Sequence, residues 1–263
     1  MRLSKEVEVL PGSPNTLIYQ GRAVVDLGGK NSSVDVNAEL QLATHGHMDH
    51  IAGLLKNSKR KFIPKEDLWA LSLMGRRVMT YGFSSKDSSL FTFDLIKDSI
   101  SIEPGDSEVE VVKLPGHTPG HSGYILGDTL YAGDAFFGKK VLEGFVFPFY
   151  LDFWQAMESL EKLRDIAKGV NNLVISHGPI QEAKKMRELL EYNLEYGAKL
   201  VKWVKEEIST PSTAEQVVVR VMRRLGAKIS PANVFLNEIV VKSILAQVGR
   251  AEVGDDGVIF VSN

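Results

Sequence analysis

The residues best suited to chemistry in this sequence are its histidines, which gather in three short stretches. Three of the six histidines lie in residues 44–50, two in residues 115–121 and one in residues 175–179. Each stretch follows a predicted strand, where loops commonly carry functional residues, and Asp134 follows another. Imidazole and carboxylate groups are common protein ligands of Zn, Fe and Mn. The pattern therefore predicts a metal site that these separate segments build together.

The spacing and number of these donors favour two adjacent ions. His45 and His47 are two apart in an extended segment, so both rings can project to the same side of the chain. Asp49 and His50 begin the next predicted helix and can turn back toward them. Five or six imidazoles with two carboxylates exceed the needs of one four-coordinate ion. A single histidine is more often structural, so the set and not any one member indicates a metal site.

The segments that must position these side chains alternate between strands and helices. Strands are predicted at residues 6–10, 16–19, 23–26, 39–44, 61–63, 99–103, 108–114, 123–126, 129–132 and 172–176. Helices are predicted at residues 49–57, after Pro64, and from Asp152 to about residue 168. Residues 81–89, with Gly, Ser and Asp, indicate a surface loop. This order predicts an α/β fold, a mixed sheet with helices on its faces.

The predicted secondary structure changes near residue 180, from alternating strands and helices to mainly helices. Helices are predicted at residues 181–208, 212–225 and 231–248, followed by a hairpin at residues 251–262 around Gly-Asp-Asp-Gly. We therefore expect two domains, residues 1–180 with the catalytic site and residues 181–263 as a small helical C-terminal domain.

Composition narrows the class of protein further. The 263 residues include 31 Lys+Arg and 33 Asp+Glu, a net charge of -2, so no strong field favours nucleic acid. The chain has no cysteine, which excludes disulfides, thiolate ligands and a cysteine nucleophile. It shows neither an export signal nor an apolar run long enough to span a bilayer. The expectation is a cytoplasmic protein with no membrane partner.

The segments ATHGHMDH, PGHTPGH, AGDAFF and ISHGP, in that order, resemble the metallo-β-lactamase superfamily. The similarity is to its thiolate-free branch, which includes glyoxalase II, lactonases, phosphodiesterases and tRNA 3′-processing nucleases. The resemblance implies an αββα sandwich with a dinuclear site at the edge where the two sheets meet. Motif by motif, it implies that metal one is held by His45, His47 and His117, metal two by Asp49, His50 and His177, and both by a bridging Asp134. The remaining histidine, His121, is expected to hydrogen-bond near the site and orient a ligand, or to be structural.

Such a pair of ions predicts hydrolysis. Two ions lower the pKa of a shared water, which places a bridging hydroxide next to an electrophile, and Asp49 can orient it. The expected substrate is a small ester, thioester, lactone or phosphoester. Because every expected ligand is nitrogen or oxygen, Zn, Fe and Mn all remain possible, and we favour Zn, with Fe next.

Substrate recognition is less sharply encoded. Lys139 and Lys140 follow Asp134 closely and either bind an anionic substrate group or belong to a solvated loop. The aromatic residues at 145, 147, 149 and 150 alternate as a strand or lid would, so Tyr150 either walls an apolar pocket or packs in the core. The basic glutathione patch of glyoxalase II has no clear counterpart among the later lysines.

Alternatives to a small-molecule hydrolase remain open from sequence. Three helices and a hairpin resemble a winged-helix tail, which favours a metal-dependent nuclease or RNA-binding protein, but the tail carries only a small basic excess. The tail could equally pack on the catalytic domain or form a homodimer face. A mononuclear iron persulfide dioxygenase would share the fold, although one ion does not need His50 and His177. A decayed site is disfavoured because all ligand positions are filled.

Overall fold

Two facing β-sheets form the centre of the computed structural model, which describes residues 1–79, 105, 109–255 and 257–262. The first sheet has the order β1-β2-β3-β4-β5. Its first three strands are antiparallel, and the later pairs are parallel. The strands are β1 Val7–Leu10, β2 Thr16–Tyr19, β3 Ala23–Val25, β4 Leu40–Leu42 and β5 Arg60–Phe62.

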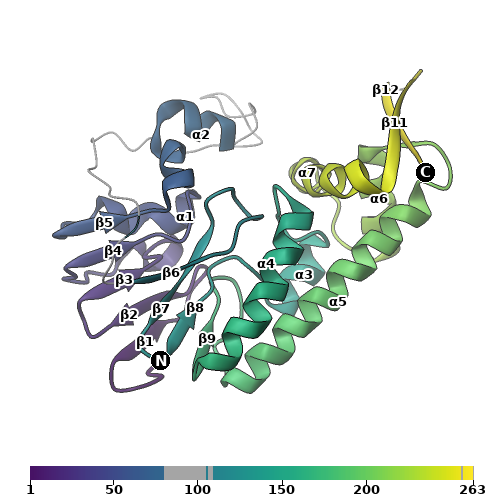
Figure 1. The fold of residues 1–263 in the computed structure, drawn as a ribbon. Coiled ribbons are helices and arrows are strands. Elements are labelled where there is room, and N and C mark those ends of the chain that lie inside the picture. Colours follow the sequence, from purple (N-terminus) through teal and green to yellow (C-terminus); the bar gives the residue numbers. More distant parts are fainter. Residues whose placement is uncertain (80–104, 106–108, 256, 263) are drawn as a thin grey trace.

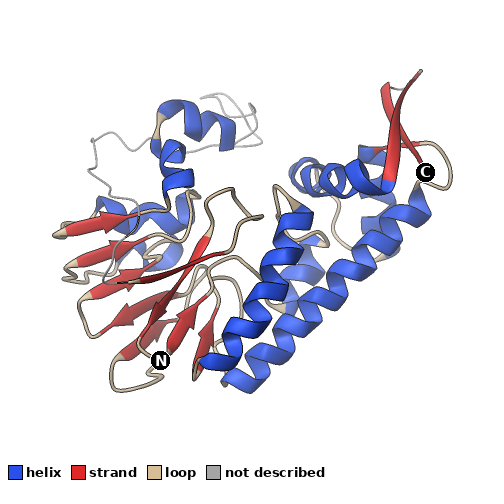
Figure 2. Ribbon diagram, in the orientation of Figure 1, coloured by secondary structure: helices blue, strands red, loops and turns tan. Residues whose placement is uncertain are grey.

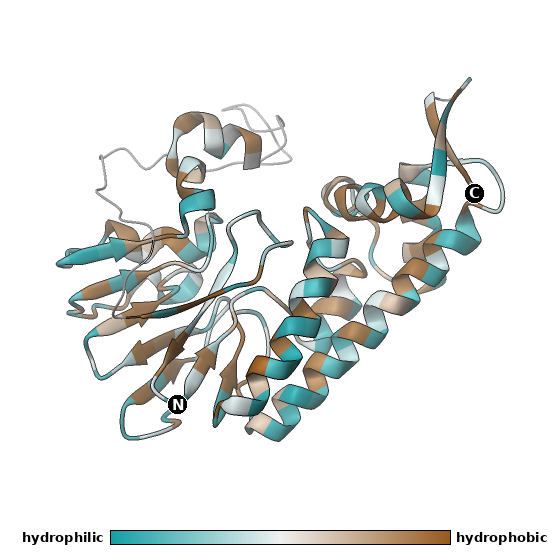
Figure 3. Ribbon diagram, in the orientation of Figure 1, coloured by the Kyte–Doolittle hydropathy of each residue, from teal (hydrophilic) through white to brown (hydrophobic). Residues whose placement is uncertain are grey.

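The second sheet has the order β6-β7-β8-β9, with β8 and β9 parallel. Its strands are β6 Glu110–Lys113, β7 Ser122–Leu126, β8 Thr129–Tyr131 and β9 Asn172–Val174. A buried cluster joins the facing sides of the sheets, with Leu17 and Val25 from the first packed with Leu126 and Tyr131 from the second. Figure 1 shows the sheets as adjacent layers, and Figure 3 shows their strands as mostly apolar segments.

Helices cover the outer sides of both sheets. On the second sheet, α4 (Phe153–Ile166) and α5 (Ala183–Glu207) bury Leu160, Leu163 and Leu190 against the strands. Asp152 caps α4 by accepting a hydrogen bond from the backbone N–H of Gln155. On the first sheet lie the short helix α1 (Met48–Ile51) and the 3-10 turns η1 (Gly29–Ser33) and η2 (Ala52–Leu55). The predicted α/β fold with αββα layers is confirmed (Figure 2).

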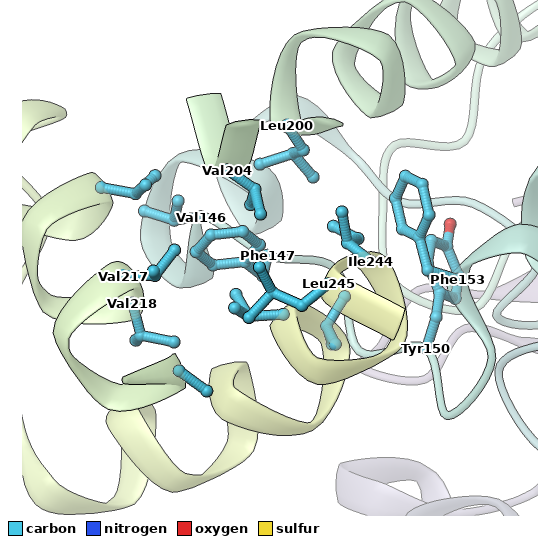
Figure 4. Close-up of a cluster of buried hydrophobic side chains, with 14 of the residues drawn as sticks. Val146, Phe147, Tyr150, Phe153, Leu200, Val204, Val217, Val218, Ile244 and Leu245 are labelled. Carbon is cyan, nitrogen blue, oxygen red and sulfur yellow. The ribbon is translucent and has the colours of Figure 1, made fainter. Parts of the chain in front are cut away.

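The C-terminal helices share one hydrophobic cluster with the sandwich. This part contains α6 (Ala214–Arg224), α7 (Pro231–Val248) and a small sheet of order β10-β12-β11. Figure 4 shows Val204, Val218 and Leu245 packed around Phe147, which belongs to the chain before residue 180. A division at residue 180 therefore passes through a common core and stays a prediction. The small strands are β10 Ser212–Thr213, β11 Gly249–Gly254 and β12 Gly257–Ser262.

Several local predictions differ from the structure. The segment after Pro64 is the 3-10 helix η3 (Lys65–Leu71), and an α-helix, α2, follows only at Leu73–Met79. The aromatic segment that alternates like a strand begins instead at the end of a helix, α3 (Lys139–Phe145). Alternation failed there because Val146 has a positive φ of 69°, which turns the chain sharply.

Other predictions are not decided. The predicted loop at residues 81–89 and strand at residues 99–103 lie outside the described residues. The helix and hairpin order of the tail is present, and its likeness to a winged helix stays a prediction. Among the described residues, no helix has both the length and the apolar character needed to cross a bilayer. The cytoplasmic location stays a prediction.

Candidate metal centre

Three imidazoles meet at the end of β4, and we call them group one: His45, His47 and His117. His45 Nε2 lies 2.8 Å from His47 Nδ1, and His117 Nε2 lies 3.1 Å and 2.9 Å from the same two atoms. His45 and His47 follow β4, while His117 lies in the connection between β6 and β7, so each sheet contributes to the group. These atoms are close enough to coordinate one ion.

A second set lies beside the first, and we call it group two: Asp49, His50 and His177. His50 Nε2 lies 3.3 Å from His177 Nε2 and 3.5 Å from an Asp49 oxygen. Asp49 and His50 occupy α1, whose short turn brings them back toward β4, and His177 follows β9. The three histidine stretches of the sequence therefore converge.

Asp134 lies between the two groups. Its Oδ2 is 3.3 Å from His117 Nε2 in group one and 3.4 Å from His177 Nε2 in group two. Asp134 follows β8 through Gly133, which has a φ of 58° and whose missing Cβ would come within 2.6 Å of His121 Nε2. A residue with a side chain would clash there, so the glycine allows Asp134 to enter the cluster.

The buried Asp26 fixes two of the histidine rings. Its carboxylate accepts hydrogen bonds from His50 Nδ1 at 2.8 Å and from the Thr44 hydroxyl at 2.8 Å. The Thr44 oxygen in turn lies 2.9 Å from His45 Nδ1, so a chain of hydrogen bonds orients His45 as well. Both rings thereby direct Nε2 toward the cluster. Asp26 was not predicted as a functional residue, although it is a carboxylate that follows a strand, as Asp134 does.

Two further histidine rings are held by hydrogen bonds on the side away from the cluster. His117 Nδ1 donates to the carbonyl of Phe149 at 2.5 Å, and His177 Nδ1 lies 2.7 Å from the Ser13 hydroxyl. The His121 ring lies beside group one, 5.4 Å from the His45 ring centre, but both of its nitrogens are engaged elsewhere. Its Nδ1 donates to the carbonyl of Leu114, and its Nε2 accepts from the backbone N–H of Asp134. His121 therefore contacts the backbone that carries a candidate ligand.

The histidines of the two groups differ in pKa, because burial dominates in group one and nearby carboxylates dominate in group two. In group one, burial lowers the pKa of His47 to about 4 and keeps those of His45 and His117 well below their usual value. In group two, burial also opposes the charged form, but nearby carboxylates outweigh it. Asp26 foremost raises the pKa of His50 to about 9, and Asp134 foremost raises that of His177 to about 10.

The donor set fits bound cations. The carbonyl of Phe149 can only accept, so His117 carries its proton on Nδ1 and turns a bare Nε2 toward two other imidazole nitrogens. Asp134 Oδ1 is buried and has no hydrogen-bond partner among the described residues. Burial opposes ionisation of Asp134, yet the imidazoles of His177 and His50 keep its pKa well below the usual range. The converging lone pairs of group one, beside a carboxylate whose buried Oδ1 lacks a described donor, are what a divalent cation satisfies.

Asp67 ties the two main histidine loops together. Its buried carboxylate accepts from the backbone N–H groups of Gly46 and Gly120, at 2.8 Å and 2.7 Å, and from the Thr118 hydroxyl at 2.7 Å. The Arg76 guanidinium donates to the carbonyl of Gly46. Neither Asp67 nor Arg76 was predicted, because both lie in helical segments that are distant in sequence from the two histidine loops.

An open cavity of about 400 Å³ leads to both groups. Apart from the candidate ligands His47, Asp49, His117, Asp134 and His177, the described residues that line it are Ser13, Phe137, Val141, Phe145, Phe147, Pro148, Phe149, Leu236 and Asn237.

The residues predicted to contact substrate lie elsewhere. Lys139 and Lys140 line a neighbouring cavity of about 600 Å³, where Lys139 Nζ sits 4.4 Å from the centre of the Tyr192 ring. Tyr150 is buried, and its hydroxyl donates to the carbonyl of Ala135. Its ring packs in the hydrophobic cluster of the helices, as the core alternative predicted.

Fold and site together define a metal-binding αββα protein, and comparison with known proteins identifies its family. The family model of the metallo-beta-lactamase superfamily matches residues 42–178, more than half of the chain. The protein belongs to this superfamily, as its motifs indicated.

Two relatives illustrate the similarity in sequence. A hydroxyacylglutathione hydrolase of Shewanella sp. (strain ANA-3) is 29% identical over 154 residues, which cover 54% of this chain and 53% of the relative. A hydroxyacylglutathione hydrolase of Haemophilus influenzae is 24% identical over 131 residues, covering 42% and 62%. The matched part thus spans little more than half the length of these curated relatives.

Solved structures agree on the fold. A metallo-beta-lactamase family protein from Thermus thermophilus aligns over 100% of both chains with a TM-score of 0.69 and 16% identity. A beta-lactamase domain protein from Burkholderia ambifaria aligns over 100% of this chain and 93% of its own, with a TM-score of 0.66 and 16% identity.

Proposed function

We propose that this protein is a dinuclear metal-dependent hydrolase acting on a small ester, thioester, lactone or phosphoester. The observation that carries the proposal is the convergence of two adjacent donor groups on Asp134 Oδ2. Hydroxyacylglutathione hydrolases among the relatives support an ester-type substrate. Because all donors are nitrogen or oxygen, Zn, Fe and Mn can each bind, and we further propose Zn as the favoured metal.

In this proposal each group would hold one ion, and Asp134 would be a donor to both. When bound, the ions would lower the pKa of a water molecule and polarise the substrate oxygen. Asp49, whose side chain is 44% exposed, can accept a hydrogen bond from attacking water at the cavity floor. Asp26, through His50 and Thr44, holds the rings in place so that little reorganisation is needed.

The second group favours two ions over one. A mononuclear dioxygenase would need group one alone, yet His50 and His177 are oriented by their own outer partners, Asp26 and Ser13. Such fixed outer contacts are typical of metal-ligating histidines.

A substrate panel tests the proposed activity. Protein supplied with Zn, Mn or Fe would be assayed on p-nitrophenyl acetate, bis-p-nitrophenyl phosphate, S-lactoylglutathione and an acyl-homoserine lactone, beside the His47→Ala variant. We expect hydrolysis of at least one class that chelator abolishes and the variant lacks. Hydrolysis of none, or equal rates for the variant, would overturn the proposal.

A further inference from the structure

We propose that the cavity above the candidate metal centre binds an apolar, uncharged chain of the substrate, and that Phe145 and Leu236 set the preference for that chain. This inference rests on the proposed hydrolase function and narrows its substrate class. It also gives α7, in the C-terminal helical part, a direct role in substrate recognition.

The lining of the cavity is the first argument. Above the candidate ligands, its wall consists mainly of apolar side chains: Phe137, Val141, Phe145, Phe147, Phe149 and Leu236. No lysine or arginine lines it within the part of the chain that the structure describes. Its volume of about 400 Å³ is in the range of small-molecule sites. An anionic group would find no positive side chain in this wall, whereas an apolar chain would lose contact with water.

Two polar side-chain groups of the wall are already engaged. Ser13 Oγ lies 2.7 Å from His177 Nδ1. The Asn237 NH2 group donates to the carbonyl of Phe145 at 2.7 Å, and Asn237 is itself buried. These two groups therefore serve the structure of the wall, and its many apolar side chains offer burial and dispersion as the main means of holding a ligand.

The apolar wall is held in place by the C-terminal helices. Val146 adopts a positive φ of 69°, an unfavourable conformation for a β-branched residue. The Tyr196 hydroxyl of α5 donates to its carbonyl at 2.8 Å, and Asn237 of α7 fixes the preceding carbonyl. This turn leaves the Phe145 side chain 46% exposed, although Phe147 beside it is buried. A large aromatic side chain held exposed at a cavity wall is available to cover a ligand.

The basic side chains nearby belong to a different cavity. Lys139, Lys140 and Lys185 line the neighbouring space of about 600 Å³, and Val141 is common to both cavities. Among the described residues, the lysines that an anionic group could meet line that neighbouring cavity and not the apolar wall. The separation favours an uncharged chain directly over the centre.

A chain-length series tests this inference on the metal-loaded protein. We expect kcat/KM for p-nitrophenyl hexanoate to exceed that for p-nitrophenyl acetate by about tenfold or more, since each buried methylene adds to binding. A flat or falling series would overturn the inference while leaving the hydrolase proposal intact. Failure to hydrolyse any ester of the series, or any substrate of the panel, would count against the hydrolase itself.

Two substitutions test which residues set the preference for the longer acyl chain. Phe145→Ala and Leu236→Ala should each reduce the hexanoate-to-acetate ratio of kcat/KM by about fivefold, because each removes apolar contact area. Both side chains are partly exposed, so the fold should tolerate the change. Leu225→Ala is the matched control, because Leu225 is 41% exposed and does not line this cavity. Equal loss for both esters would contradict the assignment of these residues.

A binding measurement gives a readout without turnover. Titration calorimetry with 1-hexanol should show binding that Leu236→Ala weakens and Leu225→Ala leaves unchanged. Ethanol should bind more weakly than hexanol by at least about tenfold. No difference between the alcohols, or equal weakening by both substitutions, would overturn the apolar site whatever the activity assays show.

Discussion

Group one and group two differ in both chemistry and enclosure. Group one has only imidazoles, and His45 and His117 are nearly inaccessible, at 0% and 3% exposure. Group two includes a carboxylate, and its side chains of Asp49 and His177 are 44% and 16% exposed. Group one is therefore the more buried half and suits stable holding of an ion, and group two is the more open half. The cavity through which a substrate arrives reaches both, since His47 and His117 also line it. Asp134 links these two environments.

The largest effect is expected where the groups meet. Asp134→Ala removes a carboxylate that lies against both groups, so bound metal should fall from about two ions per chain to below one. Activity should fall by about a thousandfold or more, the equivalent of about 4 kcal/mol of transition-state stabilisation. Metal analysis and steady-state kinetics check this. Retention of two ions would show that Asp134 does not bridge the groups.

Removing one donor of group two should show whether the two groups bind metal independently. Asp49→Ala leaves group one complete, so we expect about one ion to remain and activity to fall by about a hundredfold, as for loss of one oriented polar group. The matched control is Asp35→Ala, an exposed carboxylate outside the cavity. Simultaneous loss of both ions in Asp49→Ala would argue against two distinct groups.

Asp26 should affect both halves at once, because it orients His50 directly and His45 through Thr44. For Asp26→Ala we expect a 10- to 100-fold loss of metal affinity in about equal measure for the two ions, as for other outer partners of ligands. Competition titration against a chelator of known affinity measures it. An effect on one ion alone would contradict the shared role.

Asp67 is expected to affect the free energy of unfolding more than metal binding by either group. Asp67→Ala leaves three buried donors without an acceptor and should lower the free energy of unfolding by about 3 kcal/mol. Urea unfolding measures this. Its neighbour Glu66 pairs with Lys113 at the surface, so Glu66→Ala should change stability by less than about 1 kcal/mol. Similar values for the two variants would show that Asp67 does not brace the loops.

The smallest effect belongs to the exposed edge of group two. Ser13→Ala removes the outer hydrogen bond of His177, which solvent can replace, so activity should fall by no more than about tenfold. Kinetics of this variant beside Asp26→Ala compares an exposed outer partner with a buried one. A larger loss for Ser13→Ala would reverse the proposed order of the two halves.

Much of this arrangement was predictable from local patterns. Alternating apolar residues and turn signals predicted most strands, and the resemblance to the metallo-β-lactamase superfamily implied which histidines would meet. Within the second sheet the convergence follows from strand direction: β6, β8 and β9 run the same way, so the ends that precede His117, Asp134 and His177 lie at one edge.

Other features depended on contacts between distant segments. Asp26 and Asp67 resemble ordinary carboxylates in sequence, and only the folded chain shows that they accept buried hydrogen bonds. Lys139 and Lys140 follow Asp134 closely, yet α3 directs them to a neighbouring cavity. The role of Leu236 in the cavity wall depends on how α7 packs against the turn after α3, which no local pattern encodes.

Anomalous diffraction tests the central claim most directly. Crystals of protein purified without chelator, measured at the absorption edges of Zn, Fe and Mn, should give two neighbouring peaks. One is expected among His45, His47, His117 and Asp134, and the other among Asp49, His50, His177 and Asp134. A single peak, or peaks away from Asp134, would contradict the dinuclear centre.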